Sequence, residues 1–157
     1  MFFEGVKPSM KKSLTVIALA CATLVSTAAN AQFAKPEDGI KYRQASKVLL
    51  ASHFGRMVPV VKGEVPYDAE AIKQNVAVLS TLAALPWGAF GPGFEGGESK
   101  PEVWSDAKGF DEKRENFKVA IQELTTAADS GELAKLKVAF GKAGQSCKAC
   151  HDGYRKD

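Results

Sequence analysis

Residues 132–154 read ELAKLKVAFGKAGQSCKACHDGY and carry the clearest structural signal in the chain. Apolar residues recur there at intervals of three and four, which is the spacing of one face of an α-helix. The spacing therefore predicts one long helix from about Glu132 to Tyr154, and its inward face ends in two thiols and an imidazole. The side chains on that face are Leu133, Leu136, Phe140, Ala143, Cys147, Cys150, His151 and Tyr154.

The segment Cys147-Lys148-Ala149-Cys150-His151 matches the attachment pattern of a c-type haem. Positions i, i+3 and i+4 share one face of a helix, so each thiol can form a thioether with a haem vinyl group while the imidazole reaches the iron. The motif predicts one covalent haem c, with Cys147 and Cys150 as the attachment points and His151 as an axial ligand of the iron.

The motif has two other interpretations. A disulfide between Cys147 and Cys150 would suit an oxidising compartment, but a thioredoxin-like pair follows a strand in a βαβ unit, and no such unit is visible. A structural zinc site needs a fourth ligand, and the other histidine, His53, is remote in sequence. Haem attachment is therefore the favoured interpretation.

Three further stretches have helical periodicity, and no stretch of comparable length alternates like a strand. Pro36 opens the first and Pro59 ends or kinks it, Asp68 caps the second, and Ser105 and Asp106 cap the third. These patterns predict an all-α bundle. The predicted inward positions are Ile40, Arg43 or Gln44, Lys47, Leu50 or Ala51, and Phe54; Ile72, Val76, Leu79, Leu82 and Ala83; and Phe110, Phe117, Ile121, Leu124 and Ala128.

The connection over residues 86–101 is rich in Gly and Pro but also holds Trp87, Phe90 and Phe94. A long loop with three aromatic side chains is expected to pack against something. A bulky flat ligand would suit it.

Residues 1–31 have the pattern of an export signal. Lys11 and Lys12 form a basic segment, residues 14–25 are apolar, and Ala29-Asn30-Ala31 matches a cleavage site. Cleavage after Ala31 would leave residues 32–157 as a single domain. The apolar run is short for a bilayer and no second one follows, so no integral membrane segment is expected in the mature chain. A lipoprotein signal at Cys21 is disfavoured because Ala18 stands where a larger aliphatic residue is usual.

The charge balance gives no reason to expect a nucleic-acid partner. The chain of 157 residues has 21 basic and 18 acidic side chains, and removal of residues 1–31 takes away three and one of them, leaving 18 and 17. The mature chain would thus carry a net charge of +1, which two haem propionates would reverse.

These motifs together closely resemble the cytochromes c', the class II c-type cytochromes, across residues 32–157. The resemblance implies an antiparallel up-down four-helix bundle, a homodimer through the first two helices, a periplasmic location, and His151 as the proximal ligand. The matching segments are Lys41-Tyr42-Arg43-Gln44, Ala51-Ser52-His53-Phe54-Gly55-Arg56-Met57, the loop Leu85-Pro86-Trp87-Gly88-Ala89-Phe90-Gly91-Pro92-Gly93, and Cys147-Lys148-Ala149-Cys150-His151-Asp152-Gly153-Tyr154-Arg155.

The resemblance also implies further haem contacts. Arg43 and Gln44 would lie against the haem near its propionates, and Arg155 would stand beside His151 on the proximal face. Trp87 is expected to pack at the haem edge together with Phe90.

Lys47 departs from the family pattern, which places an apolar side chain over the open face of a five-coordinate iron. Lys47 is seven residues from both Ile40 and Phe54, so it points the same way as these apolar residues. Either its amine deprotonates and binds the iron, or its stem packs over the ring while the ammonium reaches solvent or a propionate. The flexible stem favours the second outcome slightly. His53 is about 120° around the helix from Lys47 and is expected at the surface or a subunit contact.

Three functions were compared. An electron carrier would cycle its haem iron by one electron with redox partner proteins. A binding module for nitric oxide or carbon monoxide, including a scavenger of nitric oxide, is the alternative that the resemblance suggests. Catalysis is not expected, because the chain has no distal acid–base pair.

Overall fold

The computed structural model describes residues 33–156, and the chain divides into the units Met1–Ala34 and Lys35–Asp157. The helices described below belong to the second unit. The predicted export signal and its cleavage after Ala31 lie outside the described residues.

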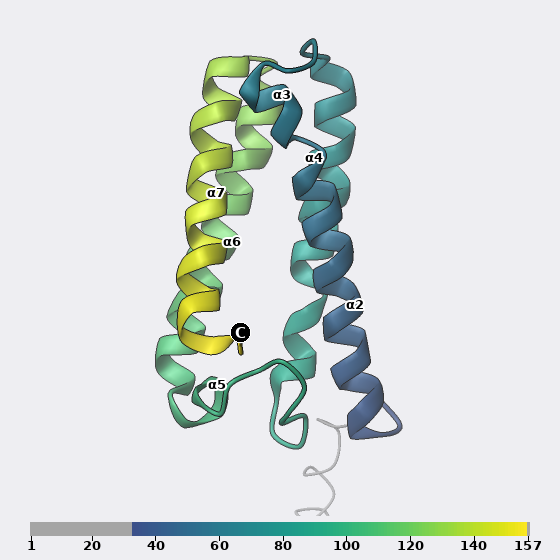
Figure 1. Ribbon diagram of the computed structural model, residues 1–157, viewed down its shortest axis with the longest axis vertical. Coiled ribbons are helices and arrows are strands. Elements are labelled where there is room, and N and C mark those ends of the chain that lie inside the picture. Colours follow the sequence, from purple (N-terminus) through teal and green to yellow (C-terminus); the bar gives the residue numbers. More distant parts are fainter. Residues whose placement is uncertain (1–32, 157) are drawn as a thin grey trace, which may run out of the picture. The chain divides into compact units, whose positions relative to one another are not determined.

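Four long helices make up the described part of the chain, and consecutive long helices run in opposite directions (Figure 1). Residues 33–156 contain no strand, although Ser99 and Arg155 form an isolated β-bridge. The predicted antiparallel four-helix bundle is confirmed. The long helices are α2 (Pro36–Gly55), α4 (Ala69–Ala84), α6 (Ala107–Asp129) and α7 (Leu133–Tyr154), and the short elements are α3 (Val58–Lys62), the 3-10 helix η2 (Pro86–Phe90) and α5 (Glu102–Ser105).

The helix ends lie where the local chemistry predicts them. Pro36 occupies the first turn of α2. The helix is interrupted before Pro59, so that α2 ends at Gly55 and α3 begins at Val58. The Asp68 side chain accepts a hydrogen bond from the Ala71 amide at 3.0 Å and caps α4. The same geometry recurs at α6, where Asp106 accepts from the amide of Gly109 at 3.1 Å.

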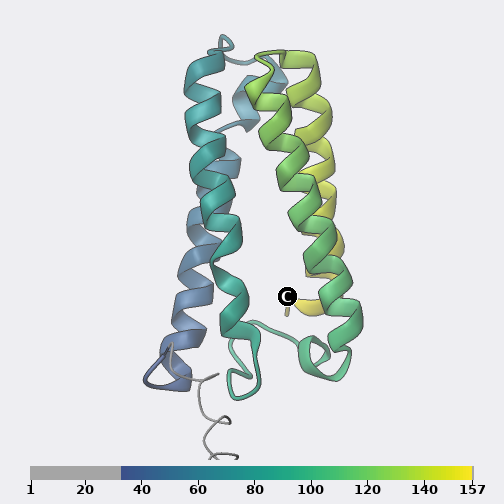
Figure 2. The same cartoon turned by 180° about the vertical axis from the view of Figure 1, so that it is seen from behind.

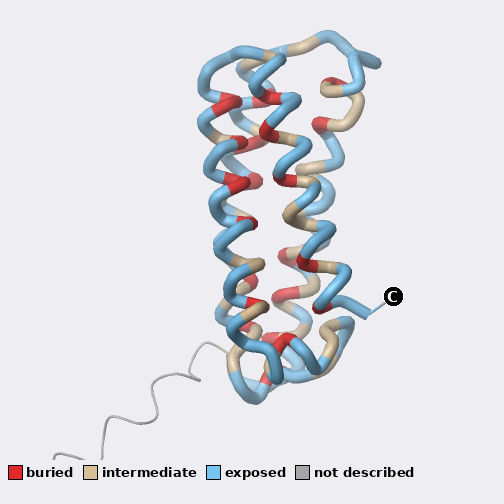
Figure 3. The backbone as a smooth tube through the Cα atoms, turned by 90° about the vertical axis from the view of Figure 1, so that its left-hand side faces the viewer, coloured by how far each residue is buried: buried red, intermediate tan, exposed pale blue. Residues whose placement is uncertain are grey.

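The helices are arranged as two pairs, α2 with α4 and α6 with α7, and Figure 2 shows the same pairing from behind. Helix α4 also packs along α6, whereas α2 and α7 approach each other less closely. Buried positions follow the inner sides of the helices (Figure 3).

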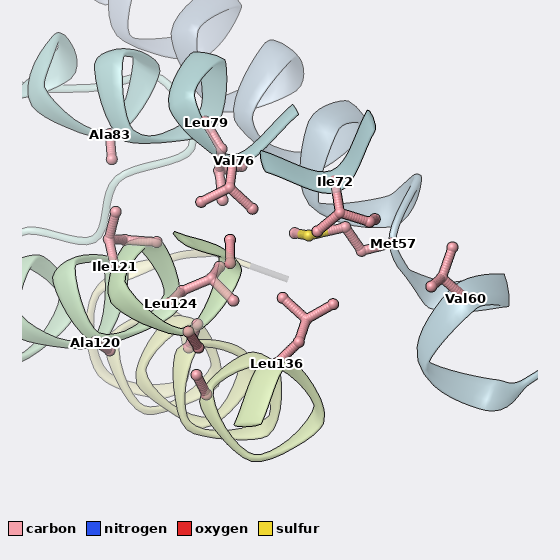
Figure 4. Close-up of a cluster of buried hydrophobic side chains, with 14 of the residues drawn as sticks. Met57, Val60, Ile72, Val76, Leu79, Ala83, Ala120, Ile121, Leu124 and Leu136 are labelled. Atoms are coloured by element: carbon pink, nitrogen blue, oxygen red, sulfur yellow. The ribbon is translucent and has the colours of Figure 1, made fainter. Parts of the chain in front are cut away.

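The larger apolar core joins α3, α4, α6 and α7. Figure 4 shows Met57, Ile72 and Leu136 converging within it, and Met57 and Leu136 are fully buried. The Phe54 ring of α2 stacks on Phe140 of α7, with 4.1 Å between the ring centroids. The buried members of this core are Met57, Val60, Ile72, Val76, Leu79, Ala83, Phe117, Ala120, Ile121, Leu124, Ala127, Ala128, Leu136, Ala139 and Ala143.

A smaller apolar cluster lies toward the α5 end, opposite the end that holds α3 (Figure 1). Its buried members are Val103, Phe110, Cys150 and Tyr154. Trp87 packs against both clusters, so this tryptophan links the main core to the part of α7 that carries the cysteines.

Candidate haem site

The two cysteines and the histidine lie in the last three turns of α7. Cys150 is buried, while Cys147 and His151 are half-buried, and neither thiol is in a disulfide. Burial raises the pKa of both thiols, and the charge of Lys47 opposes that shift. Within residues 33–156, His, Cys, Asp and Glu side chains form no group of three or more that could hold a metal ion.

Lys47 of α2 reaches toward this part of α7. Its Nζ lies 5.2 Å from the centroid of the Trp87 ring and 5.5 Å from that of Phe90. Burial lowers the pKa of the Lys47 amine; the nearby thiols of Cys150 and Cys147 oppose the shift. The structure therefore brings together the lysine of α2 and the cysteine motif of α7, from opposite sides of the bundle.

His151 has the protonation tendency that a metal ligand needs. Burial is the main cause that lowers the pKa of its imidazole, and the positive charges of Lys47 and Arg155 act in the same direction. A neutral imidazole keeps a lone pair that it can give to iron.

Aromatic side chains surround the Lys47 amine and the buried cysteine. Trp87 donates from its Nε1 to the carbonyl of Ala83 at 2.7 Å, which fixes the indole at the end of α4. The Trp87 ring lies 6.0 Å from that of Phe90 and 6.2 Å from that of Phe110, between centroids. These rings form an apolar wall beside Cys150, and the predicted contact of Trp87 with the haem edge stays a prediction.

Arg43 fastens the loop that follows η2. Its guanidinium, only 3% exposed, donates to the carbonyls of Ala89 at 2.7 Å, Phe94 at 2.5 Å and Gly96 at 2.6 Å. The group also lies over the Phe90 ring, 4.9 Å from its centroid. Arg43 thus binds one backbone carbonyl of η2 and two of the loop, and its predicted haem contact stays a prediction.

Gln44 lies beside the same loop. A Cβ added at Gly97 would come within 3.1 Å of the Gln44 Nε2, and φ of Gly97 is 58°, a conformation that favours glycine. The predicted contact of Gln44 with a propionate likewise stays a prediction.

Arg155 is exposed and directly follows α7. Its backbone amide donates to the His151 carbonyl at 3.0 Å, and its Nε lies 3.4 Å from the Oε2 of Glu98. The backbone of Arg155 thus contacts the turn that holds His151, and its guanidinium pairs with Glu98 of the loop. The predicted position of Arg155 on the proximal face of the haem stays a prediction.

His53 belongs to another part of the fold. Its Nδ1 is 2.8 Å from the Oδ1 of Asn75, and the Asn75 side chain donates to the His53 carbonyl at 2.9 Å. His53 is half-buried and links α2 to α4 through Asn75, and its predicted position at the surface or a subunit contact stays a prediction. The double contact with an asparagine far along the chain has no local sequence signal.

Trp104 is a site neighbour that sequence reasoning missed. Its Nε1 donates to the Phe90 carbonyl at 3.0 Å, and the Arg43 guanidinium lies 5.7 Å from its ring centroid. The signal was available, since a tryptophan in a one-turn helix between a Gly-rich loop and a long helix has little else to pack against.

The residues present fit a covalent haem. The chain offers two unpaired thiols and one imidazole on one helix face, with aromatic rings and the inner side of α2 facing them. Cys147 and Cys150 would hold the macrocycle, and His151 would bind its iron.

Known proteins are similar to this chain over most of its length. The family model described as Cytochrome C' matches residues 38–155. Cytochrome c' of Alcaligenes xylosoxydans xylosoxydans is 64% identical over 125 residues, covering 80% of this chain and 98% of that protein. Cytochrome c' of Rubrivivax gelatinosus is 44% identical over 128 residues, covering 80% and 99%.

Solved structures of cytochrome c prime from Alcaligenes xylosoxidans are also similar. A nitric oxide complex of a leucine-to-alanine variant has a TM-score of 0.79 and 63% identity, covering 80% of this chain and 99% of that one. A ferrous arginine-to-lysine variant with bound NO has a TM-score of 0.79 and 62% identity, with coverage of 80% and 99%. The chain belongs to the cytochrome c' family, and its cofactor is one covalently bound haem c.

Proposed function

We propose that this protein is a periplasmic mono-haem cytochrome that transfers electrons through its haem iron and binds the diatomic gases nitric oxide and carbon monoxide. The observation that carries the proposal is the two thiols and the imidazole of α7, which face the Lys47 amine and the Trp87 ring. When bound, the haem supplies an iron that changes its oxidation state by one electron.

Electron transfer is supported by the way the chain encloses the cofactor's attachment points. Cys150 is buried and Cys147 and His151 are half-buried. Partial burial limits water around the cofactor while leaving an edge near the surface for redox partner proteins. We expect no catalytic turnover, because the function requires only binding and electron exchange at the iron.

Gas binding is supported by the relatives, since several similar structures are nitric oxide complexes of cytochrome c prime from Alcaligenes xylosoxidans. The second candidate follows from the same observation: the protein is primarily a gas-binding or nitric oxide-scavenging module and not an electron carrier. The two candidates differ in whether a redox partner reduces the ferric protein at a useful rate.

The location and assembly belong to the same proposal. The export pattern of residues 1–31 supports a periplasmic protein. No helix within residues 33–156 is long and apolar enough to cross a membrane. A homodimer through α2 and α4 is supported by exposed apolar side chains on these helices, among them Val48 at 68%, Leu49 at 51% and Val78 at 45% exposure.

The first experiment is expression in a host that matures c-type cytochromes. The purified protein should be red, should stay red after acid–acetone extraction, and should have the mass of residues 32–157 plus one haem. Nitric oxide and carbon monoxide titrations of the ferrous protein should then give saturable spectral changes. A colourless protein with two free thiols would end the proposal, and a red protein that binds neither gas would reduce it to electron transfer.

A further inference from the structure

Lys47 is a half-buried cation without an acidic partner among residues 33–156. Many other lysines of the described chain pair with carboxylates, for example Lys73 with Asp129 at 3.3 Å and Lys142 with Glu123 at 2.7 Å. The Lys47 Nζ makes no ion pair or hydrogen bond with any of residues 33–156, and the groups close to it are aromatic rings and the two thiols. The Lys47 Nζ, a possible nitrogen ligand, therefore lies near the thiols that would hold the cofactor.

We propose that the Nζ of Lys47 is the second axial ligand of the haem iron, on the face opposite to His151, and that an incoming gas must displace it. This inference rests on the proposed function and adds a residue that controls access to the iron. Binding forms one nitrogen–iron bond and releases one proton from the ammonium to water; no electron is transferred.

The surroundings of the amine favour ligation over a buried ammonium. Taking an ammonium out of water costs more free energy than a cation gains by lying over an aromatic face. Trp87 and Phe90 therefore do not offset the burial, and the charges of Arg43 and Arg155 also disfavour a second cation beside them. A neutral amine avoids this cost, and its lone pair suits a Lewis-acidic iron.

A hydrogen-bonding ammonium is the competing role. In that case the ammonium would stay off the iron and donate to a bound ligand, and a lysine would strengthen gas binding. Ligation predicts the reverse, because the gas must first break the nitrogen–iron bond. The two roles therefore have opposite consequences for the same substitution.

The first test compares ferric and ferrous holoprotein by optical and electron paramagnetic resonance spectroscopy for the wild type, Lys47→Leu and Lys47→Arg. Arginine is the matched control, because it keeps a cation near the rings but does not deprotonate to bind metal. We expect a low-spin six-coordinate wild type and two high-spin variants. A high-spin wild type overturns the proposal by itself, even if a variant fails to mature.

The second test is carbon monoxide binding to the same three proteins. If lysine occupies about 99% of the iron, Lys47→Leu should bind carbon monoxide about 100-fold more tightly than the wild type. Equal or weaker binding by Lys47→Leu overturns ligation. If none of the three proteins binds carbon monoxide or nitric oxide, the gas-binding function fails, and the spin-state comparison still decides the ligand.

Discussion

Arg155 places a positive charge beside the turn of α7 that holds His151. Its guanidinium pairs with Glu98 across 3.4 Å, and both side chains are exposed. A cation near a haem favours the reduced form, which carries one positive charge less. We therefore expect the charge of Arg155 to raise the reduction potential of the haem iron, and the charge of Glu98 to offset part of that effect.

Replacement of Arg155 by Ala should lower the reduction potential by roughly 10–40 mV, the scale of one partly screened charge. It should also change the rate at which nitric oxide binds the ferrous protein. Spectroelectrochemical titration measures the potential, and Glu98→Gln is the matched variant, which should raise it. An unchanged potential together with unchanged nitric oxide kinetics would remove Arg155 from the site.

Arg43 stabilises the fold by donating hydrogen bonds to three backbone carbonyls of η2 and the loop after it. Arg43→Ala leaves the carbonyls of Ala89, Phe94 and Gly96 without this donor and empties a buried volume. The free energy of unfolding should fall by about 2–4 kcal/mol, as measured by urea denaturation of the holoprotein. The exposed Arg56→Ala should change it by less than about 0.5 kcal/mol. Similar losses for both variants would contradict a special role of Arg43.

Two helical glycines should respond oppositely to the same substitution. A Cβ at Gly109 of α6 would collide with the Asp106 carboxylate and the Tyr154 hydroxyl, whereas one at Gly141 of α7 would meet nothing within 4 Å. Gly141→Ala should stabilise the protein by about 0.5–1 kcal/mol, because alanine loses less backbone entropy on folding. Gly109→Ala should destabilise it by about 1–3 kcal/mol through overpacking. Thermal unfolding of the two holoproteins, side by side, tests the opposite signs.

The link between the start of α6 and the end of α7 depends on pH. The Tyr154 hydroxyl donates to the Asp106 Oδ2 at 2.7 Å; this bond and the Gly109 amide lower the pKa of Asp106, and the pKa of Tyr154 rises to about 12. The stabilisation is present above the ordinary Asp pKa of 3.8 and is lost as the pH falls through the lowered value. At alkaline pH, the stabilisation that the Tyr154 hydroxyl contributes is complete below pH 10 and is lost as the pH rises through about 12.

Tyr154→Phe should therefore lower the denaturation midpoint between about pH 5 and 9, and the difference from the wild type should shrink below about pH 3.5 and above about pH 11. Urea titrations across this range measure the effect. Tyr67→Phe is the control, since the buried Tyr67 hydroxyl has no hydrogen-bond partner within residues 33–156 and its removal should not lower stability. A pH-independent deficit in Tyr154→Phe would argue against the Asp106 link.

The helices could be predicted from local sequence, but the side-chain hydrogen bonds that connect one helix or loop to another could not. Pro36, Asp68 and Asp106 mark helix starts by their own chemistry, and the cysteine motif places the cofactor on α7. The contacts of Arg43 with loop carbonyls depend on the course of a Gly-rich loop, and the Tyr154 contact with Asp106 joins residues 48 apart. Such contacts depend on tertiary geometry, which periodicity does not contain.

In the whole bundle, the main core consists of protein side chains, and the haem would lie in the region between α2 and α7. Met57, Leu79 and Leu136 are fully buried in the main core, while α2 and α7 approach each other less closely and the Lys47 amine of α2 lies over the Trp87 ring. The haem would lie between α2 and α7 and would link the two helices through its contacts. Loss of the cofactor should then loosen one part of the molecule more than the other.

The double variant Cys147→Ala and Cys150→Ala, which cannot attach haem, tests this division by hydrogen exchange. Amides of residues 40–50 and 145–154 should exchange at least about tenfold faster than in the holoprotein, a loss of about 1.4 kcal/mol of local stability. Amides of residues 117–128, which pack in the main core, should change less and serve as the internal reference. The same fold-change in all three segments would mean that the bundle unfolds as one unit, with the haem stabilising every helix equally.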